Sequence, residues 1–245
     1  MCIATGIALP TDFYSNFFIF LRWIHFLAGI TWIGLLYFFN LVGFRLMKEL
    51  DPAARAKVMP ALMARAMSWF RWSALVTVLA GLAYWGQIVS TEAHAAGEGS
   101  GPATASFFLI WTIAWAALYA ILLPGKKWLE NPWVLTSVYV VVIGVAAYLF
   151  VRFNSHGWET NSVISIGIGG GIGWLMLLNV WGIVWRIQKR LILWTNANAE
   201  NGTPMPEKAP RMARISFLTA RASAILTVPM LFFMGASSHY PMFRS

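Results

Sequence analysis

The sequence predicts an all-α protein, a polytopic membrane helix bundle of about six transmembrane helices with one short helix on the membrane surface. The 245 residues are 59% hydrophobic, and the mean hydropathy is +0.64. Charged residues make up only 11% of the chain, whereas an average soluble domain has about 25%. The chain also has 14 Trp and 17 Phe residues, and aromatic side chains gather at membrane interfaces.

Each expected span is a run of apolar residues as long as, or longer than, the ~20 residues that a bilayer requires. The fourth span begins at Pro132, where a helix tolerates proline, and Pro229 is expected to kink the sixth. Residues 52–66 alternate basic side chains with Ala, Met and Leu, which predicts an amphipathic helix on the membrane surface. The expected spans, forming a single domain, are about 13–47, 68–90, 104–123, 132–153, 161–194 and 211–240.

Basic residues predict the orientation of the chain. Most Lys and Arg residues, including Lys126 and Lys127, lie in the loops after spans one, three and five, and the opposite loops hold few apart from Arg152 and Arg244. Because basic loops stay on the cytoplasmic side, we expect a bacterial-type inner membrane protein with both termini periplasmic. The net charge of +9 is assigned to this topology, so no nucleic-acid partner is expected. The single cysteine, Cys2, excludes an internal disulfide and a covalent c-type haem motif.

His25 lies within the first span, about ten residues from its outer end and therefore roughly 15 Å deep. A histidine in an apolar span is costly unless it faces the protein interior and has a partner. On a helix, His25, Gly29, Trp32 and Leu36 share one face, and Gly29 leaves room for a flat ring or for another helix. Two interpretations remain open: a haem, metal or proton-relay residue, or a histidine bonded to a backbone carbonyl in a packed bundle.

His239, near the outer end of the sixth span, is the candidate second ligand. A bis-histidine b-type haem requires two histidines on facing helices, and His25 and His239 approach each other if spans one and six are neighbours. The alternative is that His239 lies at a helix end and binds nothing. His94 and His156 belong to outer loops, and both are expected to bind nothing.

The fifth span is rich in glycine, which favours either close helix packing or a groove for a porphyrin or quinone, the former more strongly. These glycines are Gly167, Gly169, Gly170, Gly171 and Gly173.

The inner half of the bundle holds the polar residues Asn40, Asn179 and Arg221. An arginine within lipid requires a partner. Arg221 is therefore expected to snorkel, to bond to carbonyls and the two asparagines, or to meet an anion such as a haem propionate or a substrate.

Three blocks of sequence together resemble one family. They are Trp23–Asn40 (WIHFLAGITWIGLLYFFN), Asn179–Trp185 (NVWGIVW) followed by Gln188-Lys189, and the stretch from Arg221-Ala222-Ser223 to Ser238-His239-Tyr240-Pro241. In this order they resemble the membrane-bound urate oxidase N-terminal domain family, from about residue 17 to residue 241. The resemblance implies an integral membrane protein linked to the oxidation of urate, with function carried by His25, Asn40, Asn179, Arg221 and His239.

Some members of that family carry a cytochrome c domain after the last span. This chain stops at Ser245 and has no Cys-x-x-Cys-His, so its electron acceptor is expected to be a separate carrier or subunit, such as a cytochrome c.

The first functional hypothesis is a membrane oxidoreductase acting on urate or a related purine. It would hold haem b through His25 and His239, with Gly29, Trp32 and Arg221 around the cofactor. The alternative is a non-catalytic transmembrane subunit of a larger respiratory or photosynthetic complex. A transporter is third, because no internal repeat is visible. Hydrolytic chemistry has little support, because the few carboxylates lie in loops.

Overall fold

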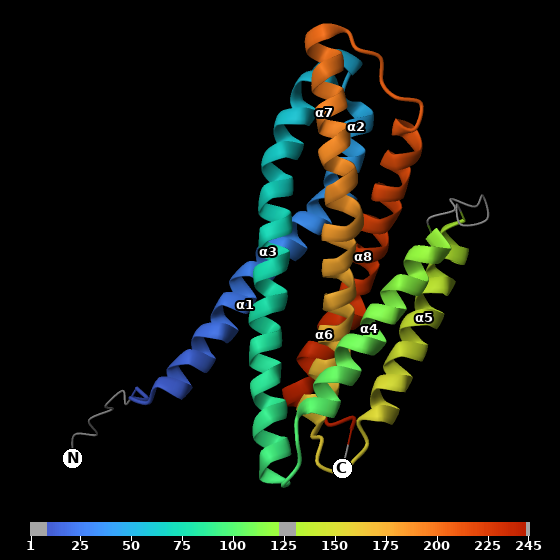
Figure 1. Cartoon of the computed structure of the whole chain (residues 1–245). Coiled ribbons are helices and arrows are strands. Elements are labelled where there is room, and N and C mark those ends of the chain that lie inside the picture. Colours follow the sequence, from blue (N-terminus) through green and yellow to red (C-terminus); the bar gives the residue numbers. More distant parts are fainter. Residues whose placement is uncertain (1–8, 123–130, 244–245) are drawn as a thin grey trace.

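The computed structural model describes residues 9–122 and 131–243 (Figure 1). In these ranges the chain is helical and contains no strand. Six of its helices are long and apolar enough to cross a membrane. This confirms the all-α membrane bundle and fits a lipid bilayer environment. Cys2, Lys126, Lys127 and Arg244, on which parts of the sequence argument depend, lie outside the described residues.

The first span is one continuous helical run that changes from α-helix to π-helix near its end. Helix α1 (Phe13–Tyr37) begins at Asp12, whose side chain accepts a hydrogen bond from the Ser15 N–H at 2.7 Å and caps the helix. The run continues through the π-helix η1 (Phe38–Gly43) into the short α2 (Phe44–Glu49). π-Helical turns are rare and occur frequently at functional sites.

Helix α3 (Pro52–Ala95) corrects the expected boundaries. Its 44 residues join the expected surface helix, 52–66, to the second span in one helix, so the surface helix is not a separate element. Asp51 caps the helix, and Pro52 occupies the first turn, where proline costs no hydrogen bond. Pro60 withholds one N–H, but strong helix formers surround it and the helix continues. At the usual rise, α3 is about 66 Å long, twice the ~30 Å of a hydrocarbon core.

Of the remaining spans, the fifth is clearly longer than expected, whereas the fourth has the expected bounds. Residues 161–201 form one helical run through a second π-helix, and the last helix continues through Pro229. The elements are α4 (Gly101–Leu122), α5 (Pro132–Phe153), α6 (Asn161–Asn179), η3 (Val180–Val184), α7 (Trp185–Asn201) and α8 (Ala209–His239).

Helix α6 is the central helix and packs against α3, α4, α5 and α8. Its glycines allow this close approach: Phe150 of α5 fills the space beside Gly167, and Trp111 of α4 fills that beside Gly171. The backbone of Met230 in α8 lies 3.1 Å from where a β-carbon of Gly169 would be. The chain's own side chains thus occupy the glycine-rich face, which supports close packing rather than a cofactor groove.

Helix α1 lies at the edge of the bundle. It packs along α3 and meets α8 where the Tyr37 hydroxyl lies 2.6 Å from the Thr227 hydroxyl. Towards its start α1 leans away from the other helices (Figure 1). The start of α1 and the end of α8 lie at the same end of the molecule, as an even number of spans requires.

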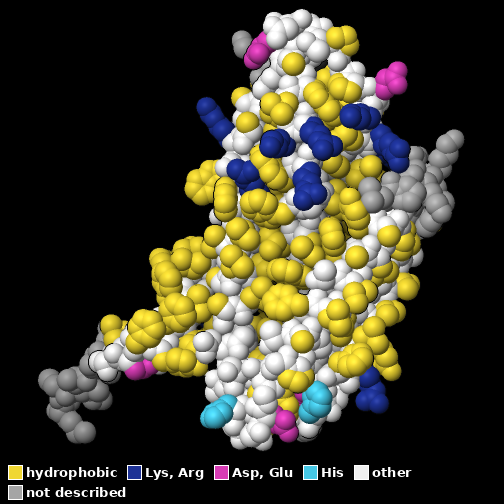
Figure 2. Space-filling view, viewed as in Figure 1, with side chains coloured by type: hydrophobic (Ala, Val, Ile, Leu, Met, Phe, Trp, Pro, Cys, Tyr) yellow, Lys and Arg dark blue, Asp and Glu magenta, His cyan; other side chains and the backbone are white. Residues whose placement is uncertain are grey.

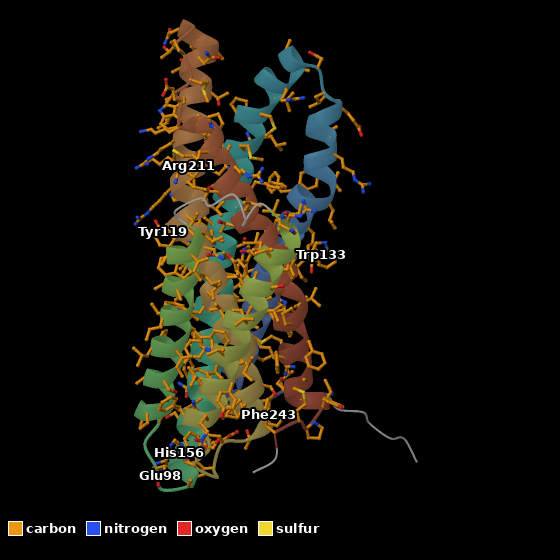
Figure 3. All side chains as sticks on the ribbon, turned by 90° about the vertical axis from the view of Figure 1, so that its right-hand side faces the viewer. Glu98, Tyr119, Trp133, His156, Arg211 and Phe243 are labelled. Carbon is orange, nitrogen blue, oxygen red and sulfur yellow. The ribbon has the colours of Figure 1, made fainter. Side chains whose placement is uncertain are left out.

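Lys and Arg side chains gather at the other end, shown at the top of Figure 2. We call this the basic end; it consists of α2, the first half of α3, α7 and the start of α8. Figure 3 places Arg211 towards this end and His156 and Glu98 at the opposite end. Described basic residues of these elements include Arg45, Arg55, Arg65, Arg186, Lys189, Arg190, Arg211 and Arg214, and Lys208 directly precedes α8.

Candidate functional site

His25 is held between α1 and α3. Its Nδ1 lies 2.7 Å from the carbonyl oxygen of Thr77. Because a carbonyl only accepts hydrogen bonds, a neutral His25 carries its proton on Nδ1 and keeps the lone pair on Nε2. This is the arrangement typical of metal-ligating histidines, whose second nitrogen donates to a carbonyl or carboxylate. The contact is also the structural alternative that the sequence left open, a histidine bonded to a backbone carbonyl.

Gly81 makes room for this ring. A β-carbon at Gly81 would lie 2.8 Å from Cε1 and 2.9 Å from Nδ1 of His25. Such distances do not occur between real atoms without displacement, so a larger residue would push the imidazole away from Thr77. Gly81 was not among the residues selected from the sequence, because its partner comes from another helix.

Gly29 and Trp32 share the face of α1 that carries His25, as the spacing predicted. Gly29 is buried, and a β-carbon there would meet the Thr77 methyl group at 3.6 Å, an ordinary contact. Trp32 is only 1% exposed. Its indole N–H finds no acceptor among the described residues, although a buried indole N–H usually has one. The His25 face therefore offers a lone pair and an unused donor.

His239 is the last residue of α8 and is exposed. His25 lies twelve residues before Tyr37, and His239 lies twelve residues after Thr227. Because α1 and α8 run in opposite directions and touch at Tyr37 and Thr227, both histidines lie about 18 Å from that contact. The two helices diverge from that contact (Figure 1), and no hydrogen bond between the two histidines is found within the described ranges.

Asn40 does not meet Asn179. It lies on η1 beside a partly open cavity of about 180 Å³, the basic-end cavity, between η1, α3, α7 and α8. Asn40 donates to the carbonyl of Leu36 at 2.8 Å, and Gln188 donates to the Ser216 hydroxyl at 3.0 Å. The apolar walls include Phe39, Met63, Met67, Phe70, Phe217 and Ala220.

Asn179 belongs to a separate cluster, where α4, α6 and α8 meet. It is 2% exposed, accepts from the Trp115 indole N–H at 3.2 Å and donates to the Ser223 hydroxyl at 3.3 Å. Side-chain hydrogen bonds of this kind join helices in membranes. The predicted polar cluster of Asn40, Asn179 and Arg221 is thus divided among three places.

Arg221 is exposed, and its guanidinium carbon lies 5.8 Å from the Phe217 ring centroid. This position agrees with snorkelling. The partly buried arginine is instead Arg71 of α3, which the sequence argument overlooked. Its guanidinium carbon lies 3.9 Å from the ring centroid of Trp185, and within 6 Å of those of Trp72 and Trp181. A pair of tryptophans four residues apart, Trp181 and Trp185, was the available sequence signal.

His94 and His156 lie at the opposite end, but only His156 is in a loop, because α3 continues to Ala95 and includes His94. The His156 ring nitrogen Nδ1 is 2.6 Å from a carboxylate oxygen of Glu159, and the His156 backbone N–H donates to the other oxygen at 2.9 Å. Burial raises the pKa of the Glu159 carboxyl, but these hydrogen bonds outweigh it and the pKa is lowered. His94 is exposed near the end of α3. Among the described residues, no three His, Cys, Asp or Glu side chains could share a metal ion.

No family model, curated protein or solved structure matches this chain. The likeness to membrane-bound urate oxidases therefore stays a prediction from the three blocks of sequence.

Proposed function

We propose that this chain is an integral membrane electron-transfer protein that holds a b-type haem through Nε2 of His25. The observation that carries the proposal is the bond from His25 Nδ1 to the Thr77 carbonyl, with Gly81 clearing space for the ring. It fixes the tautomer that leaves the Nε2 lone pair for iron. The unused indole N–H of Trp32 on the same helix face supports a cofactor that brings a hydrogen-bond acceptor.

Each residue would have a defined task. His25 would supply one axial ligand, Thr77 would orient its ring, and α1 and α3 would keep water from it. His239 is the candidate for the second ligand because it lies on the same side of the Tyr37–Thr227 contact as His25. The bound haem would supply the one-electron chemistry. Arg221 is not retained beside the cofactor, because its side chain is exposed.

The optical spectrum of the purified protein tests this proposal. Protein from haem-replete cells should show reduced Soret and α bands after dithionite, with extractable haem b in a fixed ratio to protein. His25→Ala should lose most of the haem, whereas His94→Ala, a change at an exposed histidine in the last turn of α3, should keep it. His239→Ala should shift the bands or lower the haem content. Folded wild-type protein without these bands would overturn the proposal.

The substrate and the acceptor follow from the resemblance alone. We propose urate or a related purine as the electron donor and a separate carrier, such as a cytochrome c, as the acceptor. Reduction of the haem bands by urate, but not by an unrelated purine nucleoside, would support the donor assignment. Urate that leaves the oxidised bands unchanged would contradict it.

The proposed location is a bacterial-type inner membrane, with the basic end in the cytoplasm and both termini in the periplasm. The gathering of Lys and Arg at one end supports it. In a Cys2→Ser background, a cysteine replacing Ser155 should react with an impermeant thiol reagent in spheroplasts. A cysteine replacing Asn198 should react only after lysis. The reverse pattern would invert the topology.

A second candidate function is a non-catalytic subunit of a larger membrane complex. The outer half of α1 favours it, because this half leans away from the other helices (Figure 1) and carries exposed apolar side chains. Trp23→Ala combined with Phe26→Ala should then weaken co-migration with a partner in mild detergent. Val140→Ala combined with Val141→Ala, on the exposed face of α5, is the control. Migration as a single chain from native membranes would exclude this candidate.

A further inference from the structure

We propose that the basic-end cavity binds the ring of a lipid-soluble quinone or quinol. The proposal names a partner for the electron-transfer function, and it rests on that function for its purpose but not for binding itself. Its basis is a ring-sized apolar space within the helix bundle that also presents two amides and one hydroxyl.

The volume of the cavity limits the size of the ligand that it can hold. Its volume is about 180 Å³, and an apolar cavity of about 150 Å³ in a protein accommodates benzene. One substituted six-membered ring therefore fits. A haem macrocycle is several times larger, so this cavity is distinct from the site at His25. The cavity is partly open, so it need not enclose the isoprenoid tail.

The polar groups match the oxygens of such a ring. The amide of Asn40 donates to Leu36, which leaves its Oδ1 as an acceptor. Gln188 donates to Ser216, which leaves the Gln188 oxygen as an acceptor and the Ser216 proton as a donor. A quinone carbonyl can accept from Ser216, and a quinol hydroxyl can donate to either amide oxygen.

Other small ligands fit less well. An acyl chain fills apolar space but gives these three groups no partner, and polar groups left unpaired away from water are costly. Urate carries more polar groups than the cavity can pair, because its walls are mainly Phe, Met and Leu. Phe39, Phe70 and Phe217 provide the flat surfaces against which an aromatic or quinoid ring packs.

Both π-helices of the described chain border this cavity. Phe38, Phe39, Asn40 and Gly43 come from η1, and Val184 is the last residue of η3. A π-helical turn departs from regular α-helix geometry, and such turns frequently mark functional sites. Their presence on two helices at one cavity is a second observation that points to a binding site.

A photoreactive azido-quinone with a ten-carbon tail tests the proposal on the full-length protein. In the wild type, the label should attach to peptides from residues 36–46 and 59–70, and decylubiquinone should compete. Ala220→Trp, which fills the cavity, should reduce labelling at least tenfold. Ser216→Ala should weaken decylubiquinone binding roughly three- to tenfold, as loss of one hydrogen bond does.

Two matched variants keep the test specific. Thr219→Ala removes a buried hydroxyl from the same helix outside the cavity, and Ile225→Trp adds bulk at an exposed position of α8. Both should label like the wild type. If Ala220→Trp does not fold, as judged by its unfolding midpoint and elution volume, Ser216→Ala and Asn40→Leu decide the matter.

The possible outcomes separate the proposals. Labelling of other segments, or unchanged binding in Ser216→Ala, would overturn the quinone site. Equal competition by decylbenzene, which has the tail without oxygens, would show an acyl-chain crevice and also overturn it. His25→Ala should keep its labelling even without haem bands. Labelling of a wild type that lacks haem would preserve this site while the haem proposal fails.

Discussion

The indole ring of Trp111 in α4 occupies the space that a β-carbon at Gly171 in α6 would require. This contact sets how closely the two helices approach in the centre of the bundle. Trp111 is fully buried, and its indole N–H has no acceptor within the described ranges. Close packing around the glycine is therefore the main stabilising interaction of this side chain.

Gly171→Ala should destabilise the fold by about 3 kcal/mol, because the added methyl group overlaps a ring that cannot move freely. Thermal unfolding in detergent measures the change. Gly144→Ala is the matched control, since its β-carbon would meet nothing within 4 Å, and the better helix propensity of alanine should raise stability by roughly 0.5–1 kcal/mol. Equal effects of the two substitutions would contradict the packing argument.

Gly81→Ala should displace the His25 imidazole from the Thr77 carbonyl, because its β-carbon would lie 2.8 Å from the ring. The Nδ1 resonance of ¹⁵N-labelled histidine should lose the signature of a hydrogen-bonded N–H, whether or not haem is present. Gly86→Ala lies on the same helix with open space around it and should leave the spectrum unchanged. An unchanged His25 resonance in Gly81→Ala would contradict the contact.

Arg71→Lys should cost about 0.5–2 kcal/mol of stability, because a lysine ammonium does not stack on indole as a guanidinium does. Trp185, whose ring centroid lies 3.9 Å away, contributes most of the interaction. Arg221→Lys, at an exposed arginine 5.8 Å from a phenylalanine ring, should change the unfolding free energy little. Denaturant titration followed by tryptophan fluorescence distinguishes the two. Similar losses of unfolding free energy in the two variants would show that the tryptophan rings around Arg71 do not contribute to stability.

The Glu159 carboxylate should make the outer loops sensitive to acid. Its pKa in the folded protein is lowered, so ionisation stabilises the fold above the ordinary glutamate value. That stability is lost as the pH falls through the lower folded value. The unfolding midpoint should therefore drop more steeply below about pH 4.5 in the wild type than in Glu159→Gln. Glu98→Gln, an exposed residue at the same end, should keep the wild-type slope.

The spans could be predicted from the sequence because hydropathy and loop charge act locally. The ends of the fourth span were also predicted, but those of the long runs that contain α3 and α7 were not. From local sequence alone, Pro60 predicts the end of a helix. Helix α3 nevertheless continues through it, because the free energy lost with one hydrogen bond is smaller than the free energy that the rest of this long helix contributes. The π-helices η1 and η3 left no signal either, because the shift in hydrogen bonding has no residue signature of its own.

The site was predicted in part. The face shared by His25, Gly29 and Trp32 follows from helical spacing and was identified from the sequence. Gly81 and the basic-end cavity depend on which helices are neighbours, and Gln188 and Ser216 are 28 residues apart. For Arg221 the sequence left snorkelling, bonding within the bundle and contact with an anion open, because only the tertiary packing fixes which way the helix faces, and the side chain is exposed.

Helix α3 connects two places that have been described separately. Met63, Met67 and Phe70 line the basic-end cavity, and Thr77 and Gly81 hold His25, so about two turns of one rod lie between them. A rotation of this rod that widens the cavity also turns the carbonyl beneath the imidazole. Because the same helix contributes to both places, a ligand in the cavity should change the position of the His25 ring, and a group bound at His25 should change the shape of the cavity.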